Sequence, residues 1–494
     1  MSRTSACATP LRKKRAETPR YRVRIMDNIN REHPEYEAKK KMWKKYRDLY
    51  SGGEQLRERA TEYLIPRNKE PDKVYSERVS RVYYENYIGS IIDWYSATLL
   101  RREPVLTVSG ANESGRQFFN EFAEDCDLKG TSLSDFFRQQ LVNTLVFGKA
   151  YVALEFPRFS QPAPNRAEED ASGRSRAFLV EYSADEVINW SYGSDGTPDW
   201  IVMRTSCLRQ EKVTDPEWKR ETRWIYYDRE DFRIYSSVEG RDGEAGAIRL
   251  ADEGKHGLAA QRRVPVFQLK VTDGLWLMNK AALLQLEHFN KSNALSWALT
   301  MGLFATPVVY SDREWNQIVG EGYFIQLSPE DKFGWTEPEG HVFKIAAENL
   351  DRLKDEIYRV CYLIAQAAGP QASVAQSGLS KQRDFSITQE VLRAYGDAVK
   401  ETIKQTLRAI ETARQDGLAI DVSGLDEFDI GDFSNELDDA RKLLEIGIES
   451  ETLKKQLFKK LALKYFCDAR QEIKTTIAGE IDASFEQGKR DNEG

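Results

Sequence analysis

Apolar side chains recur every three or four residues in several long segments of the chain, and this spacing predicts amphipathic helices. Two such segments stand close together, over 346–368 and 385–416. Gly369-Pro370 ends the first, because glycine suits a helix end and proline cannot continue a helix. Ser386 followed by Gln389 has capping-box spacing near the start of the second. The pattern therefore predicts two helices joined by a non-helical stretch.

The stretch between these two helices, residues 369–384, consists mostly of small and polar residues. We expect a flexible loop, uncharged to basic, which suits brief contact with a smooth polyanion. For its two cations the alternative is that they are ordinary solvated charges. The candidate contact residues are Gln371, Ser373, Gln376, Ser377, Ser380, Lys381 and Arg383.

A helix, a compact segment and another helix follow one another upstream of this loop. Helical spacing over 275–302 gives way to short apolar runs separated by glycine and proline turns at 303–345. Strands are predicted in this segment at 307–310, 323–327 and 341–345. We therefore expect a small β-rich module inserted between two long helices, 275–302 and 346–368.

The remainder of the chain combines both periodicities, and together they predict an α+β fold that is mostly helical. Residues 421–432 are predicted to be an acidic, turn-rich link, and 433–494 to be helical, with a break at Gly447 and a restart at Ser450. Further helices are predicted over 35–63, 75–100 and 133–146, and strands at 105–108, 150–156, 178–180, 200–207, 222–228, 232–238 and 264–271.

Charge restricts the range of functions. The 494 residues carry a net charge of -7, with a pI of about 5.6, which argues against a protein that simply coats nucleic acid. Residues 1–30 are instead basic and poor in apolar side chains, which predicts a disordered arm. The alternative is an arm that meets nucleic acid or an acidic partner.

Cysteine spacing and hydropathy indicate the compartment. The five cysteines lie far apart, are odd in number and form no C-x-x-C pair, so we expect free thiols in a reducing compartment. No apolar run approaches the roughly 18 to 20 residues of a membrane span, and no secretory signal is visible. We expect a soluble protein that is made in the cytosol.

Motifs for catalysis are missing from the sequence. It contains no P-loop, no dinucleotide-binding glycine motif, no G-x-S-x-G, no H-E-x-x-H and no zinc-ligand spacing. His288 is expected to be a packed or surface residue and not a ligand. An acidic group could bind a cation, but its spacing departs from the calcium-loop pattern, so a solvated linker is favoured: Asp421, Asp426, Glu427, Asp429 and Asp432. We expect no enzyme, no metal and no cofactor.

Several short segments match motifs of one known family. Residues 181–190, E-Y-S-A-D-E-V-I-N-W, are similar to a Y-x-A-E-x-I-I-N-W motif and differ from it mildly at Asp185 and Val187. On these residues the chain resembles the portal proteins, or head-to-tail connectors, of tailed bacteriophages, over nearly its whole length. Weaker matches are a Y-x-x-R…N segment at 75–78 and 83–89, a stem-entry segment at 286–290 with Pro307, and a G-I-x-S turn at 446–450.

The resemblance implies a portal fold with defined parts. Residues 31–274 would form the wing, 275–302 and 346–368 the two stem helices, and 303–345 the clip. Residues 369–384 would be the tunnel loop at the narrowest point of a channel. The long wing helix and link would occupy 385–432, and the crown 433–494. The arm at 1–30 has no counterpart in the family.

The same resemblance implies a function without catalysis. Portal subunits form a ring, usually of twelve copies, at one capsid vertex of the virion, after assembly in the cytoplasm of the host bacterium. Double-stranded DNA passes through the ring during packaging and ejection. The implied partners are the terminase large subunit, the major capsid and scaffolding proteins and the head–tail adaptor, and no membrane.

Physical chemistry fits such a conduit. A wall with little affinity is needed, because each phosphate that a fixed cation neutralises adds binding that would arrest sliding, and an acidic channel repels the duplex toward its axis. Two other hypotheses remain open. One is a ring-forming virion adaptor or scaffold without DNA passage, and the other is an unrecognised hydrolase that acts on nucleic acid.

Overall fold

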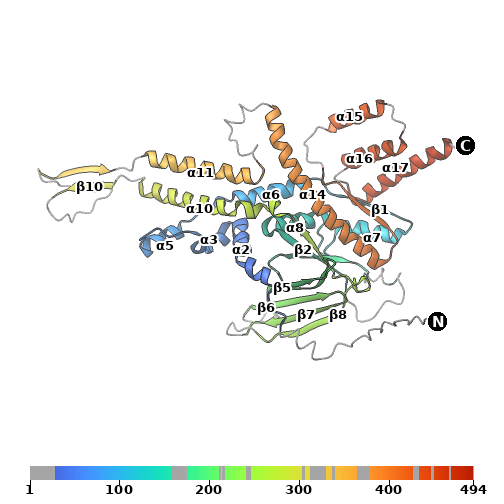
Figure 1. The fold of residues 1–494 in the computed structure, drawn as a ribbon, viewed down its shortest axis with the longest axis horizontal. Helices are drawn as coiled ribbons and strands as arrows, with labels where there is room; N and C mark the ends of the chain where they lie inside the picture. The colour runs from blue at the N-terminus through green and yellow to red at the C-terminus, as the bar shows by residue number, and fades with distance from the viewer. Residues whose placement is uncertain are drawn as a thin grey trace, which may run out of the picture. The chain divides into compact units, whose positions relative to one another are not determined.

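The chain contains both helices and sheets, so the predicted α+β class is confirmed (Figure 1). It divides into two compact units, which we call the strand unit (Met1–Lys40 and Asp185–Val266) and the helical unit (Lys41–Ala184 and Phe267–Gly494). The computed structural model describes residues 28–157, 168, 173, 175–210, 213, 217–240, 246–302, 306–311, 330–336, 340–363, 378–426, 433–446, 450–466 and 469–492. Most of the predicted basic arm, residues 1–27, lies outside these ranges.

The strand unit is built on one antiparallel sheet with the order β4-β5-β6-β7-β8. Four consecutive residues of β6, Trp224 to Tyr227, are buried, so the centre of this strand is covered on both faces. The Trp224 indole N–H donates to the Asn30 side chain at 3.1 Å, which ties the first described residues to the sheet. The strands are β4 (Val187–Tyr192), β5 (Pro198–Arg209), β6 (Lys219–Asp228), β7 (Asp231–Val238) and β8 (Arg249–Lys255).

Two strands of this sheet were not predicted. β4 pairs with β5 through two register shifts, between Val187 and Asn189 and between Ser191 and Tyr192, and such irregular pairing breaks the period-two pattern. β8 is an edge strand with the sequence R-L-A-D-E-G-K, which contains few residues that favour strands. The predicted strands at 200–207, 222–228 and 232–238 correspond to β5, β6 and β7.

The helical unit holds most of the helices, and polar side chains cap several of them. Asn86 accepts a hydrogen bond from the Gly89 N–H at the start of α6, and Asn112 accepts from Gly115 at the start of α7. After α2 (Pro34–Ser51), which begins in the strand unit, come α3 (Gly53–Glu58), α4 (Ala60–Tyr63), α5 (Asp72–Ser80), α6 (Tyr87–Leu99), α7 (Glu113–Glu124) and α8 (Leu133–Phe147).

One predicted helix is two helices in the structure. The helix expected over 75–100 is split into α5 and α6, because Asn86 caps a new helix after residues 81–86. The helix α7 was not predicted, although its Phe119 and Phe122 are buried. Short caps and breaks of this kind change the path of the chain without disturbing the apolar spacing on either side.

Two small sheets complete the inner part of the helical unit. One has the order β3-β2-β9, with β2 (Lys149–Glu155) between β3 (Phe178–Ser183) and β9 (Val266–Lys270), and α8 packs on it. The other pairs β1 (Val105–Ser109) with β12 (Ala419–Ser423), with Thr107 opposite Asp421. β12 lies where an acidic link was predicted, because its buried Ile420 and Val422 alternate with exposed polar residues.

The helix–strand–helix order upstream of the predicted loop is confirmed. α10 (Leu277–Gly302) is followed by the antiparallel pair β10 (Thr306–Tyr310) and β11 (Lys332–Thr336), and then by α11 (Gly340–Val360). The strand predicted at 341–345 is wrong, because these residues continue the apolar helical spacing of α11 backward to Gly340. β11 was not predicted, and the strand predicted at 323–327 lies outside the described residues.

The last part of the helical unit is helical, as predicted for 433–494. A 37-residue helix, α14 (Gly378–Arg414), leads to β12. The Ser450 side chain accepts from the Leu453 N–H at 3.2 Å, which confirms the predicted helix restart there. The final helices are α15 (Phe433–Glu445), α16 (Glu451–Tyr465) and α17 (Gln471–Asn492).

Three of the five cysteines lie within the described ranges. Cys126, Cys207 and Cys361 are free thiols, and Cys207 is exposed. The other two cysteines lie outside the described residues. Within the part of the chain that the structure describes, no helix is both long enough and apolar enough to cross a membrane.

A buried carboxylate joins α2 to the two short helices after it. The Asp48 side chain is fully buried and accepts hydrogen bonds from Arg59 at 2.6 Å, Tyr63 at 2.6 Å and Gln55 at 3.0 Å. Burial alone would raise the pKa of Asp48, but these three donors together bring its pKa below the ordinary value. The ionised carboxylate is therefore the form that stabilises this corner of the helical unit.

Asp48→Asn removes the charge from this cluster with little change of shape, and we expect it to lower the free energy of unfolding by about 2 kcal/mol at pH 7. A depressed carboxyl pKa contributes stability that is present above the unfolded pKa of about 4 and is lost as the pH falls through the folded value. Urea unfolding at pH 7 and pH 3 should therefore show a smaller wild-type advantage at pH 3. An equal advantage at both pH values would contradict this assignment.

Candidate functional site

The two long helices α10 and α11 lie side by side and run in opposite directions (Figure 1). Lys280 near the start of α10 donates to the Tyr362 hydroxyl, just beyond the end of α11, at 2.5 Å. Lys291, further along α10, donates to the Asn349 side chain at 2.9 Å, earlier in α11. Residue numbers therefore increase along α10 while they decrease along the facing side of α11, so the two helices are antiparallel. The strands β10 and β11 lie in the segment that connects them.

Three carboxamides on α10 attach this helix to residues 63–88. A carboxamide can donate and accept at once, so each one satisfies a backbone N–H and a backbone C=O that lack helical partners. The pairs are Gln285 with the Ile88 N–H and Glu85 C=O, Asn290 with the Ile65 N–H and Tyr63 C=O, and Asn293 with the Tyr83 N–H and C=O. We call this set the amide ladder.

His288 lies on α10 between the residues of the amide ladder and is buried. Its Nε2 is 3.4 Å from the Glu85 carboxylate, and its ring meets Tyr87 edge-on. Burial lowers the pKa of His288, although Glu85 opposes this effect, so the ring is neutral at pH 7. It is a packed residue, as the sequence predicted.

Three tyrosine hydroxyls gather where α11 ends and α10 begins. Tyr95 of α6 donates to the Cys361 C=O at 2.7 Å, and Tyr395 of α14 donates to the Leu275 C=O at 2.6 Å. Tyr362 donates to the Gly274 C=O at 3.0 Å. We call Tyr95, Tyr362 and Tyr395 the tyrosine cluster. It joins α6 and α14 to the backbone just after α11 (Cys361) and just before α10 (Gly274 and Leu275), where these carbonyl groups lie outside the two helices.

The backbone at Tyr362 is held in an uncommon conformation. Its φ of 63° lies in the left-handed region, which residues other than glycine rarely adopt. The Thr388 hydroxyl donates to the Tyr362 C=O at 2.6 Å, and the Lys280 ammonium lies 4.1 Å from the centre of the Tyr362 ring. These contacts fix the direction in which the chain leaves α11.

Burial keeps the hydroxyls of Tyr95 and Tyr395 and the thiol of Cys361 protonated. It raises the pKa of both Tyr95 and Tyr395 above the ordinary range and raises the pKa of the Cys361 thiol to about 12. All three groups are therefore neutral at pH 7, and the two hydroxyls remain donors. The cluster is suited to holding backbone in place and offers no nucleophile.

The predicted contact residues lie directly after this cluster, and the structure describes only some of them. Gln371, Ser373, Gln376 and Ser377 lie outside the described residues. Ser380, Lys381 and Arg383 belong to the first turns of α14, and their side chains are not described. The loop predicted to reach residue 384 is therefore corrected: α14 begins at Gly378, because no proline or glycine interrupts 379–395 and helix propagation is favourable once started.

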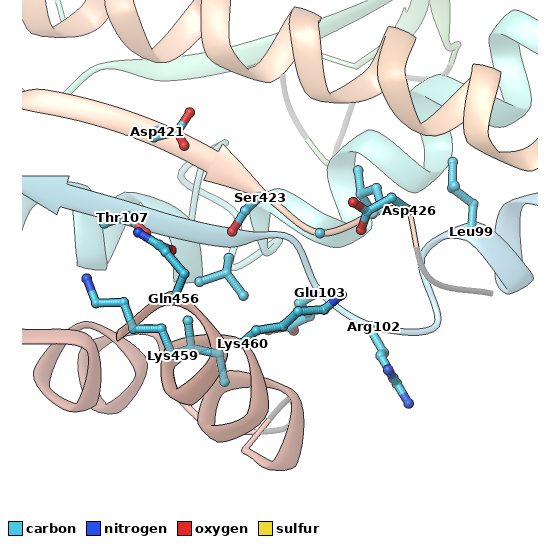
Figure 2. A pocket seen from close by; sticks show the side chains of 14 residues that line it. Leu99, Arg102, Glu103, Thr107, Asp421, Ser423, Asp426, Gln456, Lys459 and Lys460 are labelled. Carbon is cyan, nitrogen blue, oxygen red and sulfur yellow. The ribbon is translucent and has the colours of Figure 1, made fainter. Parts of the chain in front are cut away.

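A cleft of about 470 Å³ lies elsewhere in the helical unit, between the β1–β12 pair and α16. Figure 2 shows Thr107 and Ser423 on the strand side and Gln456, Lys459 and Lys460 on the helix side. Lys459 pairs with Asp482 at 2.6 Å, and Asp421 pairs with Lys404 at 2.7 Å. At least these two of its charged groups are therefore engaged within the protein.

The predicted acidic linker is spread over different surroundings. Asp421 is part of β12, Asp426 lines the cleft, and Glu427, Asp429 and Asp432 lie outside the described residues. Among the residues that the structure describes, no group of three histidine, cysteine or carboxylate side chains is placed to hold a metal ion.

The amide ladder and the tyrosine cluster were not predicted from the sequence. Their partners are backbone groups of residues more than a hundred positions away in several cases, such as the Leu275 C=O for Tyr395. Periodicity identifies an apolar stripe but contains no information on which carbonyl a hydroxyl will reach. Polar residues interrupting the apolar face of 275–302, at positions 285, 290 and 293, were the signal that could have indicated the ladder.

Tyr395→Phe deletes one hydroxyl of the tyrosine cluster, at a fully buried residue, and removes the donor to the half-buried Leu275 carbonyl. We expect the free energy of unfolding to fall by about 1–2 kcal/mol, measured by urea unfolding at fixed protein concentration. Tyr310→Phe, at an exposed strand residue, is the matched control and should change stability by less than about 0.5 kcal/mol. Equal effects of the two substitutions would contradict the role of the cluster.

Comparison with known proteins identifies two kinds of likeness. Residues 278–408, from α10 into α14, match a family model described as a domain of unknown function, DUF4055. A comparison with curated proteins finds no match.

Three solved structures that resemble the chain come from gene transfer agent (GTA) particles. One is "Virion of native gene transfer agent (GTA) particle", with 14% identity over 78% of this chain and 92% of that one, at a TM-score of 0.41. "Neck of empty GTA particle computed with C6 symmetry" has 13% identity over 75% and 89%, at 0.40. "Neck of native GTA particle computed with C12 symmetry" has 12% over 74% and 86%, at 0.38.

Proposed function

We propose that this chain is a portal-type subunit, in which copies form a ring at one capsid vertex of a phage-like virion and surround a channel for double-stranded DNA. The observation that carries the proposal is the α10–β10–β11–α11 element. The tyrosine cluster holds the end where α11 stops and α10 begins, the amide ladder holds the middle of α10, and strands connect the other ends of the two helices. This is the arrangement expected of a two-helix stem with a strand module between its helices.

Exposed aliphatic side chains on these helices support assembly into a ring. Val342 and Ile345 near the start of α11 are 65% and 53% exposed, and Leu299 near the end of α10, at the same end of the helix pair, is 40% exposed. Large apolar side chains gathered on one element of a single chain mark surfaces that a partner covers. In a closed ring each copy would cover them with the helix pair of its neighbour.

The charge of the helix pair suits a wall along which DNA slides. α10 carries two lysines and one glutamate, and α11 carries four basic and four acidic side chains. A nearly neutral surface adds little of the salt-dependent phosphate binding that would hold a duplex in place. An acidic channel, which would repel the duplex toward its axis, is not needed for this purpose.

The remaining parts take roles around this stem. The β10–β11 pair would dock the terminase large subunit during packaging and the head–tail adaptor afterwards. Residues 369–377, with the first turns of α14, would line the narrowest part of the channel. The major capsid and scaffolding proteins would meet the outer surface of the ring. None of these roles requires catalysis, in keeping with a sequence that has no catalytic motif.

Negative-stain microscopy of the purified chain tests the proposal directly. We expect closed rings, usually of twelve copies, with an axial opening wide enough for a duplex of about 20 Å. Rings without an axial opening would favour an adaptor or scaffold without DNA passage. A single compact chain at micromolar concentration would exclude a portal ring.

Deleting residues 373–377 should leave the rings intact and impair DNA packaging or the retention of packaged DNA, because the deletion stops before α14 and spares the tyrosine cluster. Replacement of 373–377 by the same number of alternating glycine and serine residues is the length-matched control. We expect it to retain most of the packaging measured as nuclease-protected DNA. Monomeric protein after the deletion would instead place these residues in the assembly contact.

A further inference from the structure

The sheet of the strand unit has an open edge in an unusual place, along the second half of β5. β4 pairs with β5 only from Pro198 to Met203, and the Arg204 N–H then donates to the Glu186 C=O. Beyond this point no described strand pairs with 205–209 on the side of β5 away from β6. Residues 206–209 are exposed, so their outward backbone groups are open to another strand.

Side chains beside this edge are apolar and cationic. Leu208 of β5 pairs with Arg220 of β6, so the two side chains share a face of the sheet. Trp218 directly precedes β6, two residues before Arg220. Leu208 is 63% exposed and Trp218 is 64% exposed. On the other face Arg209 pairs across with Lys219 and also contacts the Glu221 carboxylate at 3.1 Å. A partner of this edge should therefore offer carboxylates and an apolar side chain.

The opposite edge of the same sheet offers such groups. β8 is the last strand in the sheet order, and six of its seven residues are exposed. Asp252 and Glu253 lie in its centre, and Leu250 is 41% exposed. Arg249 and Lys255 are confined to its two ends. Each edge thus carries an exposed leucine, and β8 has its two carboxylates between two terminal cations.

Strand direction is compatible with joining these two edges from different copies. Because every neighbouring pair from β5 to β8 is antiparallel, β5 and β8 of one chain run in opposite directions. If the ring axis runs along the strands, rotation about it leaves the direction of each strand unchanged. The β8 of the next copy would then run antiparallel to β5 of the first copy. A ring requires such a heterologous contact between two different surfaces of the chain.

We propose that neighbouring copies join their five-stranded sheets edge to edge, with the open part of β5 in one copy pairing with β8 of the next. This inference rests on the proposed ring and assigns one of its contacts. Strand addition satisfies backbone groups on both edges, and it places Leu250 and Glu253, which share a face of β8, on the Leu208 face and Asp252 on the Arg209 face.

The exposed thiol of Cys207 on β5 allows a direct test in the full-length chain. Cysteine is introduced singly along β8, as Leu250→Cys, Ala251→Cys, Asp252→Cys and Glu253→Cys, since only some registers bring two sulfurs together. Each sample is oxidised with copper phenanthroline, run on a denaturing gel without reductant, and viewed by negative stain. Val238→Cys on β7, 44% exposed but not on the edge strand, is the matched control.

At least one β8 variant should form a ladder of linked chains that continues beyond two, about a hundredfold faster than the control, because paired strands hold both thiols at high effective concentration. Adding Cys207→Ser to that variant should abolish the ladder. Rings without a Cys207-dependent ladder in any of the four variants would overturn the edge pairing and leave the ring standing. Linkage that stops at two chains would also overturn it, and absence of rings would remove the proposed function itself.

Discussion

Backbone carbonyl groups at the base of the α10–α11 pair, of which the Cys361 C=O is buried, accept hydrogen bonds from phenolic hydroxyls. Tyr95 and Tyr395 reach the Cys361 and Leu275 carbonyls from α6 and α14. Since an unpaired carbonyl away from water is costly, these hydroxyls stabilise the place where the four helices meet. The left-handed backbone of Tyr362 is tolerated for the same reason, as its carbonyl, hydroxyl and ring each have a partner.

This junction and the amide ladder divide the helix pair into two parts with different properties. Near the junction, polar side chains pair with backbone and leave α10 little freedom to shift. Further along, aliphatic residues such as Leu299 and Val342 remain exposed in the part of the chain that the structure describes. A rigid base with an uncovered outer part is suited to packing against a neighbouring copy without rearrangement. The proposed ring uses this property to keep a channel of constant width.

In the strand unit, backbone groups at the sheet edges, and not mainly exposed side chains, form the surfaces proposed for assembly. Its sheet ends in two unlike edges, β8 and the second half of β5, and neither is closed by another described strand. Natural proteins usually cover or blunt such edges because they invite pairing. Two complementary edges on one chain become an advantage when copies are arranged around an axis, since each edge finds its complement in the next copy.

Apolar periodicity alone determined most elements of this protein. It identified α8, α10 and the strands β2, β5, β6 and β7, and it predicted that strands would separate two long helices. It failed where elements are short, capped or polar: α7, β4, β8 and β12 were missed, residues 341–345 continued a helix, and α14 began seven residues early. In these places a cap or a cross-strand neighbour outweighs local preference.

The candidate site divides in the same way. The sequence located a polar stretch after α11, and it could name Lys381 and Arg383 because composition is local. Only the tertiary structure decided that these two residues begin a helix and that Tyr95, Tyr362 and Tyr395 hold the backbone before them. The physical reason is that hydrogen bonds to backbone carbonyls join residues far apart in the chain. Their geometry exists only after the helices have packed.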